Sequence, residues 1–594
     1  MILYRIDATD TRAHLFRITL TVAAPAAEQR LSLPVWIPGS YLVREFARHL
    51  STLSVRQGGR DLPLRQLDKA SWSAHTDGRS ELTVSYSIYA FDTSVRAAFL
   101  DAQRGFFNGT GLLLKVHGAE DQVHRVELSA MPDGWRVATA MAPLDVDADG
   151  RGTYQAANYD ELVDHPVELG QFWRGTFTAR GIPHAFVVAG ALPDFDGERL
   201  LADSARICEA QIAFWHGPAD TATPPFDRYL FLLNAVEEGH GGLEHRASTA
   251  LIAPRRDLPR RDATKADSPA DKIEASDGYV NLLGLISHEY FHAWNVKRLM
   301  PRNFERYDYA HENYTDLLWF FEGFTSYYDD LFLLRSGLID DSRYLKLLAR
   351  TISNVAATPG RRVQSVADAS FDAWVKYYRN DENTPNATIS YYAKGALVAL
   401  AFDLTLRGGG HGSGSLDAVL RRLWSTSGGG PIDERDIAGA LEAVGGRSFA
   451  GELAAWVHGT DELPLRPLLE SAAVEWQAVP PTVAQRLGVR ASESALTGVK
   501  VTHVLRGGAA EAAGLAAGDE LLAVGDWRIR RLEEAQRVLT EVETPVLVAR
   551  DQRILSIRLA LPSGAGDGAG AVALKPAAKP AAPALALYKA WLAG

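Results

Sequence analysis

The sequence predicts a multidomain α+β fold, in which β-rich and helical regions follow one another along 594 residues. Three observations lead to this prediction. Short runs of alternating apolar and polar residues fill the first 170 positions, long apolar runs of helical type occupy the middle, and a glycine-rich strand–helix–strand pattern begins near residue 471. A chain of this length is expected to form about three or four domains.

The amino-terminal region, residues 1–170, is predicted to form an antiparallel β-sandwich. Residues 15–22, 81–89 and 125–130 alternate apolar and polar side chains, and Gly, Pro and Asp separate the runs. Alternation with a period of two places one face of each strand in a core, and many short strands of this kind are typical of a sandwich.

The most informative segment of the middle region contains His288, Glu289 and His292 in the order His-Glu-x-x-His. Positions i and i+4 of a helix lie on one face, so both imidazoles can reach one metal ion. The carboxylate of Glu289 is then placed to accept a proton from a metal-activated water. The flanking residues favour a helix, and Pro301 is expected to end it. The segment therefore predicts a zinc site with Glu289 as the catalytic base.

A catalytic zinc site needs a third protein ligand and one open position. Residues 317–329 form a second apolar segment with Glu322 in its middle. A carboxylate among aromatic side chains is costly to bury without a partner, and a zinc ion provides one. Glu312 and Asp316 are alternatives in a more polar stretch. The hydrogen-bond partner that orients the zinc-binding histidines could be Asp316, Asp329 or a backbone carbonyl.

The strings around His288 and Glu322 resemble the glycyl aminopeptidase family of thermolysin-like (gluzincin) zinc metallopeptidases. The resemblance implies one zinc ion per chain, held by His288, His292 and Glu322. It also implies a thermolysin-like catalytic domain at 171–345 and a helical domain at 346–470 that completes the cleft. Residues 416–424 and 437–444 show the apolar periodicity expected of such helices.

A glycine-rich segment upstream resembles the substrate-anchoring strand of zinc aminopeptidases. It contains Gly241, Gly242 and Glu244, and glycines allow a backbone to lie close to a ligand. In the resembled enzymes this Glu binds the free amino group of the substrate, which restricts cleavage to a chain end. Glu237 and Glu238 are weaker alternatives for the same role.

A further motif runs from Tyr391 to Gly395, with the sequence Tyr-Tyr-Ala-Lys-Gly. It resembles the turn of zinc aminopeptidases in which a Tyr hydroxyl stabilises the oxyanion of the reaction. By this match the catalytic tyrosine is Tyr392, and Tyr391 is the alternative.

The carboxy-terminal region contains a strand, a short helix and the sequence Gly514-Leu-Ala-Ala-Gly518-Asp519 before a second strand. This pattern resembles a PDZ domain, which we assign to 471–562. PDZ domains bind extended peptides at a sheet edge, and the alternative is that this one is a structural module rather than a receptor. The partner would be a peptide or another part of this chain. Residues 563–594 are rich in Ala, Pro and Gly and are predicted to be flexible, with a terminal stub at Tyr588 that docks on the body. The polar insert at 254–277 is predicted to be a mobile loop.

The formal net charge is −11, which argues against nucleic acid or an anionic membrane as the main partner. No apolar run is long enough to span a membrane, and the first residues lack the apolar core of a signal peptide. Cys208 is the single cysteine, so an internal disulfide is excluded. A cytoplasmic location is expected.

Together these features favour a zinc aminopeptidase that acts on peptides with a free amino terminus. The resemblance implies a preference for glycine or alanine at that terminus. A thermolysin-like endopeptidase is one alternative, in which Glu244 contacts an internal backbone. A PDZ scaffold with a vestigial metal site is the other, and the complete set of motif residues argues against it.

Overall fold

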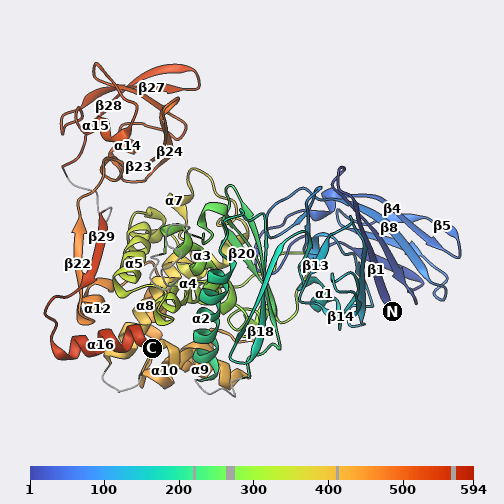
Figure 1. The fold of residues 1–594 in the computed structure, drawn as a ribbon. Coiled ribbons are helices and arrows are strands. Elements are labelled where there is room, and N and C mark those ends of the chain that lie inside the picture. The colour runs from blue at the N-terminus through green and yellow to red at the C-terminus, as the bar shows by residue number, and fades with distance from the viewer. Residues whose placement is uncertain (218–222, 262–274, 410–413, 564–569) are drawn as a thin grey trace. The chain divides into compact units, whose positions relative to one another are not determined.

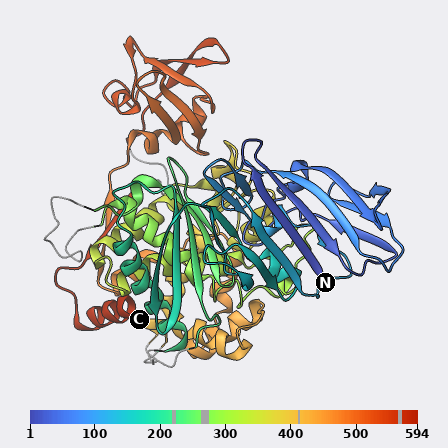
Figure 2. The same cartoon turned by 45° about the vertical axis from the view of Figure 1, so that its right-hand side comes forward.

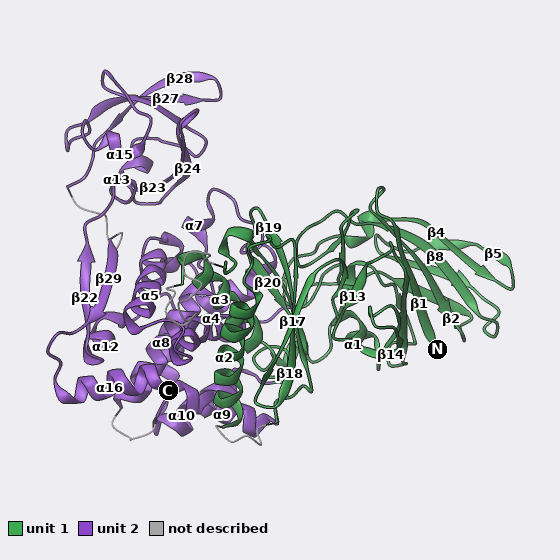
Figure 3. Cartoon of the chain, in the orientation of Figure 1, with its two compact units in different colours: residues 1–313, 429–431 green, residues 314–428, 432–594 purple. Residues whose placement is uncertain are grey.

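The computed structural model describes residues 1–217, 223–261, 275–409, 414–563 and 570–594. These residues divide into two compact units (Figure 3). Unit 1 comprises residues 1–313 and 429–431, and unit 2 comprises 314–428 and 432–594. Most of the insert predicted to be a mobile loop, residues 262–274, lies outside the described residues.

Unit 1 begins with the predicted β-rich domain. Its largest sheet has the strand order β14-β15-β12-β1-β2-β8-β4-β5, antiparallel apart from the parallel pair β1 and β12. Smaller sheets have the orders β13-β16-β10-β9 and β11-β3-β7-β6. The alternating runs of the sequence correspond to β2, β8 and β12. The bounds are β1 Ile2–Asp10, β2 Leu15–Val22, β3 Glu28–Ser32, β4 Leu50–Gln57, β5 Arg60–Leu62, β6 Leu64–Gln66, β7 Ser71–His75, β8 Leu82–Tyr89, β9 Ala98–Leu100, β10 Arg104–Phe107, β11 Lys115–Val116, β12 His124–Ala130, β13 Arg136–Ala138, β14 Ala142–Val146, β15 Gly152–Ala156, α1 Tyr159–Val163 and β16 Val167–Gly170.

The second part of unit 1 is a mixed sheet with the order β17-β18-β19-β21-β20. Strand β19 is a continuous apolar run and is almost wholly buried, as expected for a strand with parallel neighbours on both sides. Helices α2 and α3 pack against this sheet (Figures 1 and 2). The bounds are β17 Trp173–Ala179, β18 Ile182–Ala189, α2 Gly197–His216, β19 Tyr229–Val236, β20 Gly241–Glu244, β21 Ser248–Pro254 and α3 Asp277–Phe291.

Helix α3 is shorter than the sequence suggests. It ends at Phe291 rather than near Pro301, so this expectation was wrong. The chain leaves the helix in a series of turns, and the positive φ of 106° at Val296 prevents it from continuing as a helix towards Pro301. The turn is closed by a hydrogen bond of 2.9 Å from the backbone N–H of Leu299 to the carbonyl of Trp294.

Unit 2 opens with the predicted helical region. Helices α4 and α8 cross so closely that a Cβ on Gly323 would lie 2.6 Å from the Cα of Gly395, so only glycine permits this approach. The bounds are α4 Leu318–Arg335, α5 Asp341–Ala356, α6 Val366–Phe371, α7 Thr384–Ala387, α8 Ala393–Gly408, α9 Leu416–Ser427, α10 Glu434–Gly445, α11 Ala450–Glu452 and α12 Leu465–Ser471.

The PDZ domain of unit 2 lies between the paired strands β22 and β29, which form a ribbon that leads into it and back (Figure 1). β22 falls inside the range assigned to the PDZ domain but pairs with the tail instead. The bounds are β22 Val474–Val479, α13 Val483–Leu487, β23 Val489–Ser494, β24 Gly498–Val504, α14 Ala509–Ala512, β25 Glu520–Val524, β26 Trp527–Arg528, α15 Leu532–Ala535, β27 Thr544–Arg550, β28 Arg553–Leu559 and β29 Ala571–Pro576.

The tail differs from the flexible segment that its composition predicts. Beyond residues 564–569, which lie outside the described residues, it forms β29 and then helix α16, Ala582–Ala593. Alanine is the best helix former, and Pro583 stands in the first turn, where proline is tolerated. Trp591 is fully buried and donates a hydrogen bond of 2.9 Å to the hydroxyl of Tyr327. The multidomain α+β class is confirmed, whereas the five-part domain division remains a proposal.

Candidate functional site

Helix α3 carries both histidines of the His-Glu-x-x-His motif at its carboxyl end. The side chain of Ser276 caps the start of the helix by accepting a hydrogen bond from the backbone N–H of Tyr279. His292 follows the last helical residue but keeps helical dihedral angles, and its N–H donates to the carbonyl of His288 over 3.3 Å. The i, i+4 relation is therefore preserved, and both rings lie on one face.

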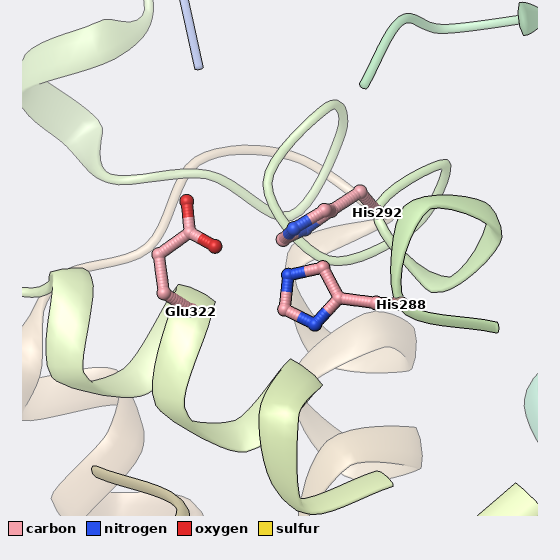
Figure 4. Close-up of side chains that lie close together, drawn as sticks. All are labelled: His288, His292 and Glu322. Atoms are coloured by element: carbon pink, nitrogen blue, oxygen red, sulfur yellow. The ribbon is translucent and has the colours of Figure 1, made fainter. Parts of the chain in front are cut away.

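Helix α4 carries Glu322, which is buried among aromatic residues. The metal-binding atoms of His288, His292 and Glu322 all lie within 4.8 Å of one another. Figure 4 shows the carboxylate of Glu322 facing the two imidazole rings. Two imidazole nitrogens and one carboxylate oxygen match the donor set of a catalytic zinc site, and a fourth position remains for water. The three side chains fit the metal that the motif predicts.

The ring of His292 is oriented by the backbone. Its Nδ1 lies 2.7 Å from the carbonyl oxygen of Asn295, so Nδ1 carries the proton and Nε2 is available to a metal. Of the orienting partners considered from the sequence, a backbone carbonyl is the one that serves this histidine. The same hydrogen bond fixes the chain where it leaves the helix.

Glu289 is buried beside the glycine-rich strand β20. A Cβ at Gly242 would overlap the carboxyl group of Glu289, so this close approach requires glycine. Strand β20 pairs with β21 and ends the strand order of the described sheet. The guanidinium of Arg96 donates a hydrogen bond of 3.2 Å to the carbonyl of Gly242. A catalytic base candidate and an edge strand that can receive a peptide thus lie together.

Glu244 ends β20 and is 4% exposed. Its carboxylate lies against the backbone of Gly39, where a Cβ would lie 2.5 Å from either carboxylate oxygen. The alternatives Glu237 and Glu238 are exposed, and Glu238 is paired with Arg256. Burial at the end of the edge strand favours Glu244 as the amine-binding group.

A buried ion cluster braces the residue that follows Glu244. The ammonium of Lys297 lies 2.7 Å from the carboxylate of Asp164, and the Nδ1 atom of His245 lies 3.3 Å from it. The backbone N–H of Arg246 donates to the same carboxylate over 2.9 Å. Burial would raise the pKa of Asp164, but the Lys297 ammonium, His245 and Arg246 hold it well below its usual range. Asp164 therefore remains ionised and ties the anchor strand to the segment that follows α3.

Tyr392 precedes the first turn of α8, and its hydroxyl lies 3.3 Å from the hydroxyl of Tyr378. Burial and the neighbouring carboxylate of Glu322 raise its pKa well above the usual value, so the hydroxyl keeps its proton. The alternative, Tyr391, is fully buried, whereas Tyr392 is partly exposed. The environment of Tyr392 suits a hydrogen-bond donor.

Sequence reasoning missed four residues that support these groups: Gly39, Arg96, Asp164 and Tyr378. Each is distant in sequence from the group it supports or lies outside the motifs. For Gly39, the available signal was its place after Pro38, because a Pro-Gly pair marks a turn.

Within the described ranges, no helix is both long and apolar enough to cross a membrane.

A family model described as "M61 glycyl aminopeptidase" matches residues 281–398, and one described as "Peptidase M61 N-terminal domain" matches residues 3–171. A PDZ domain model matches residues 477–548. A search of the curated proteins found no match.

Among solved structures, a protein from Idiomarina loihiensis described as belonging to the aminopeptidase N family is 35% identical. It superposes with a TM-score of 0.92, and the alignment covers 100% of each chain. An M1 zinc metallopeptidase from Deinococcus radiodurans is 16% identical, with a TM-score of 0.45 over 78% of this chain and 94% of that one.

Proposed function

The chain belongs to the M61 glycyl aminopeptidase family and is a metalloaminopeptidase, and we propose that it removes an amino-terminal glycine or alanine from peptides. The observation that carries the proposal is the cluster of His288, His292 and Glu322, whose ligand atoms lie within 4.8 Å of one another. The description of the matched family supports glycine, and alanine is included as the next smallest residue.

The metal is proposed to be one zinc ion per chain, held by His288, His292 and Glu322. When bound, zinc lowers the pKa of water and polarises the scissile carbonyl. The donor set supports zinc because imidazole and carboxylate ligands leave a tetrahedral site with one position open.

Glu289 is proposed to accept the proton of the attacking water and to pass it to the leaving amine. Its position beside the backbone of Gly242 supports this role, since a substrate that pairs with the edge strand would bring its scissile bond close to this carboxylate. The partners of that strand would be the backbone groups of the peptide.

Glu244 is proposed to bind the substrate's ammonium group. A buried carboxylate at the end of the anchor strand would fix the terminal residue in register, and a charged pair is stronger there than in water. Gly241 and Gly242 would allow the substrate backbone to lie close to the strand.

Tyr392 is proposed to donate a hydrogen bond to the oxyanion that develops on the substrate carbonyl. Its raised pKa supports this role, because a phenol that keeps its proton remains a donor at neutral and mildly alkaline pH. Tyr378 would hold the hydroxyl in position.

The PDZ domain is proposed to bind an extended peptide, supplied by a partner or by this chain, through addition to a sheet edge. This role is separate from catalysis and is supported by the matched PDZ model.

The proposed function is tested with a short peptide that begins with glycine and with its N-acetylated twin. Cleavage of the free peptide alone is expected, because acetylation removes the charge that Glu244 would recognise. For Glu244→Gln, kcat/KM on the free peptide should fall roughly thirtyfold or more, which corresponds to a loss of about 2 kcal/mol of transition-state stabilisation. The matched control is Glu238→Gln, which removes an exposed carboxylate and should leave the rate unchanged. Equal cleavage of both peptides would instead establish an endopeptidase.

A further inference from the structure

A cavity of about 500 Å³ lies within unit 2, and none of the residues that line it is assigned to catalysis. Its walls come from helices α5, α8 and α12, from the short helix Pro359–Arg362, and from the ribbon of β22 and β29. Figures 1 and 2 show the ribbon beside α5 and α12, and contacts between these elements confirm that they are neighbours. The volume falls in the range of about 300–1,000 Å³ typical of small-molecule sites.

The cavity is positively charged although the chain as a whole is acidic. The described residues that line it include the cations Arg361, Arg362, Lys394 and Arg466, opposed by the carboxylate of Glu462. That carboxylate is largely exposed and is shared between Arg361, at 3.0 Å, and Arg362, at 3.4 Å. Arg466 is also paired, with the carboxylate of Glu470 at 2.8 Å. Solvent screens these exposed carboxylates, so the positive charge of the lining comes mainly from the buried Lys394 and from Arg361.

Lys394 is the least balanced of these cations. Its residue is 3% exposed, and Nζ donates one long hydrogen bond of 3.4 Å to the carbonyl of Arg361. Among the described residues, no carboxylate lies within ion-pair distance of it. Burial lowers the pKa of Lys394, and the carboxylates of Glu462 and Asp461, which lie beyond ion-pair distance, only partly oppose this shift. A bound anion would supply the missing partner.

The opposite part of the lining is apolar. Ile352 and Val355 face the cavity from α5, Leu397 from α8 and Trp476 from β22. A small hydrated anion would leave this surface without a partner, whereas a ligand with both an anionic group and an apolar chain would contact both parts.

We propose that this cavity binds an organic anion that carries an apolar chain, with its charged group at Lys394 and the neighbouring arginines. The proposal does not depend on the aminopeptidase activity. Residues two positions apart on a helix point about 200° apart, so Lys394 and Tyr392 face opposite sides of the start of α8. A ligand at Lys394 would leave the catalytic side free.

The site is also linked to the catalytic helices through the backbone. Lys394 precedes Gly395, which lies against Gly323 in the close crossing of α8 and α4. Gly323 in turn follows Glu322. Binding in the cavity is expected not to compete with the peptide substrate.

The test titrates the full-length protein with dodecanoate in a calorimeter. The dodecyltrimethylammonium cation has a chain of the same length and opposite charge, and inorganic phosphate has charge without a chain. Dodecanoate is expected to bind at one site, and neither control probe should bind there. Lys394→Met and Arg466→Glu should each weaken binding about tenfold or more, the loss of one charged interaction. Arg350→Glu, an exposed site on α5 outside the lining, should have no effect.

Three binding results would overturn the proposal. These are equal binding of the cation and the anion, phosphate affinity equal to that of dodecanoate, and unchanged affinity in both lining variants. Arg466 is exposed, so its variant should fold even if Lys394→Met does not, and thermal unfolding of each variant checks this. Competition between dodecanoate and the peptide substrate would place the ligand in the active site and would also contradict the proposal.

Discussion

The buried pair of Asp164 and Lys297 provides the most quantitative prediction. The two side chains are 9% and 4% exposed and lie 2.7 Å apart. Asp164→Asn would leave the ammonium buried without its carboxylate, and breaking a buried pair in this way costs about 3–5 kcal/mol. The matched control is Glu127→Gln, which breaks an exposed pair with Arg5 and should cost less than about 1 kcal/mol.

The assay is urea unfolding at neutral pH, followed by tryptophan fluorescence. It is applied to Asp164→Asn, to Lys297→Met, to the double variant that combines them, and to the control Glu127→Gln. The double variant should recover much of the lost stability, because the buried ammonium is removed together with its carboxylate, and the remaining partner Arg246 is partly exposed to solvent. A loss below about 1 kcal/mol for Asp164→Asn, or a double variant less stable than either single one, would refute the reasoning.

The same ion cluster predicts how the stability of the protein depends on pH. The pKa of Asp164 is depressed in the folded protein, so its contribution to stability is complete above the unfolded value of about 3.9. That contribution is lost as pH falls through the folded pKa. In the wild type, acid should therefore reduce stability more steeply than in Asp164→Asn, and parallel stability–pH curves for the two proteins would contradict this assignment.

Three further predictions concern the neighbouring groups. Gly39→Ala would place a Cβ 2.5 Å from the carboxylate of Glu244, so KM for a free amino terminus should rise; an unchanged KM would argue against the anchor role. Tyr392→Phe should lower kcat by about 100- to 1,000-fold with the metal content unchanged, because the oxyanion loses a hydrogen-bond donor; a fall of less than about tenfold would contradict this role. Trp591→Ala removes a fully buried ring and its bond to Tyr327, and should cost about 3–5 kcal/mol in thermal unfolding; a loss below about 1 kcal/mol would mean that α16 is not docked.

The sequence predicts those parts of the fold that repeat locally. The alternation at 15–22 predicts β2 to the residue, because each side chain reports the face on which it lies. The end of α3 could not be predicted in this way. The residues after His292 favour a helix, but the positive φ of Val296 is imposed by the surrounding fold.

Composition misled the prediction for the tail. Ala and Pro are common in flexible linkers, yet the same residues form α16 once Trp591 has a buried position. The predicted docking of the stub at Tyr588 is confirmed, because Tyr588 and Trp591 bond to Asp341 and Tyr327. Its docking position could not be predicted, since it is built from residues about 250 positions earlier.

In the candidate site, too, residues in local motifs could be predicted and residues that act through distant contacts could not. His288, His292 and Glu322 carry recognisable motifs, and the structure brings them together. Asp164 carries none, because its importance comes from contacts more than 80 positions away in the chain. Roles assigned through the resemblance, including those of Glu244 and Tyr392, remain proposals.

The central claim is that Glu289 moves protons at a metal site formed by other residues. The most direct test measures zinc content and kcat together for Glu289→Gln, with His288→Ala as the variant that should lose the metal. We expect Glu289→Gln to retain one zinc ion per chain while kcat falls by about 100- to 10,000-fold. Loss of zinc from Glu289→Gln, or activity close to that of the wild type, would contradict this account.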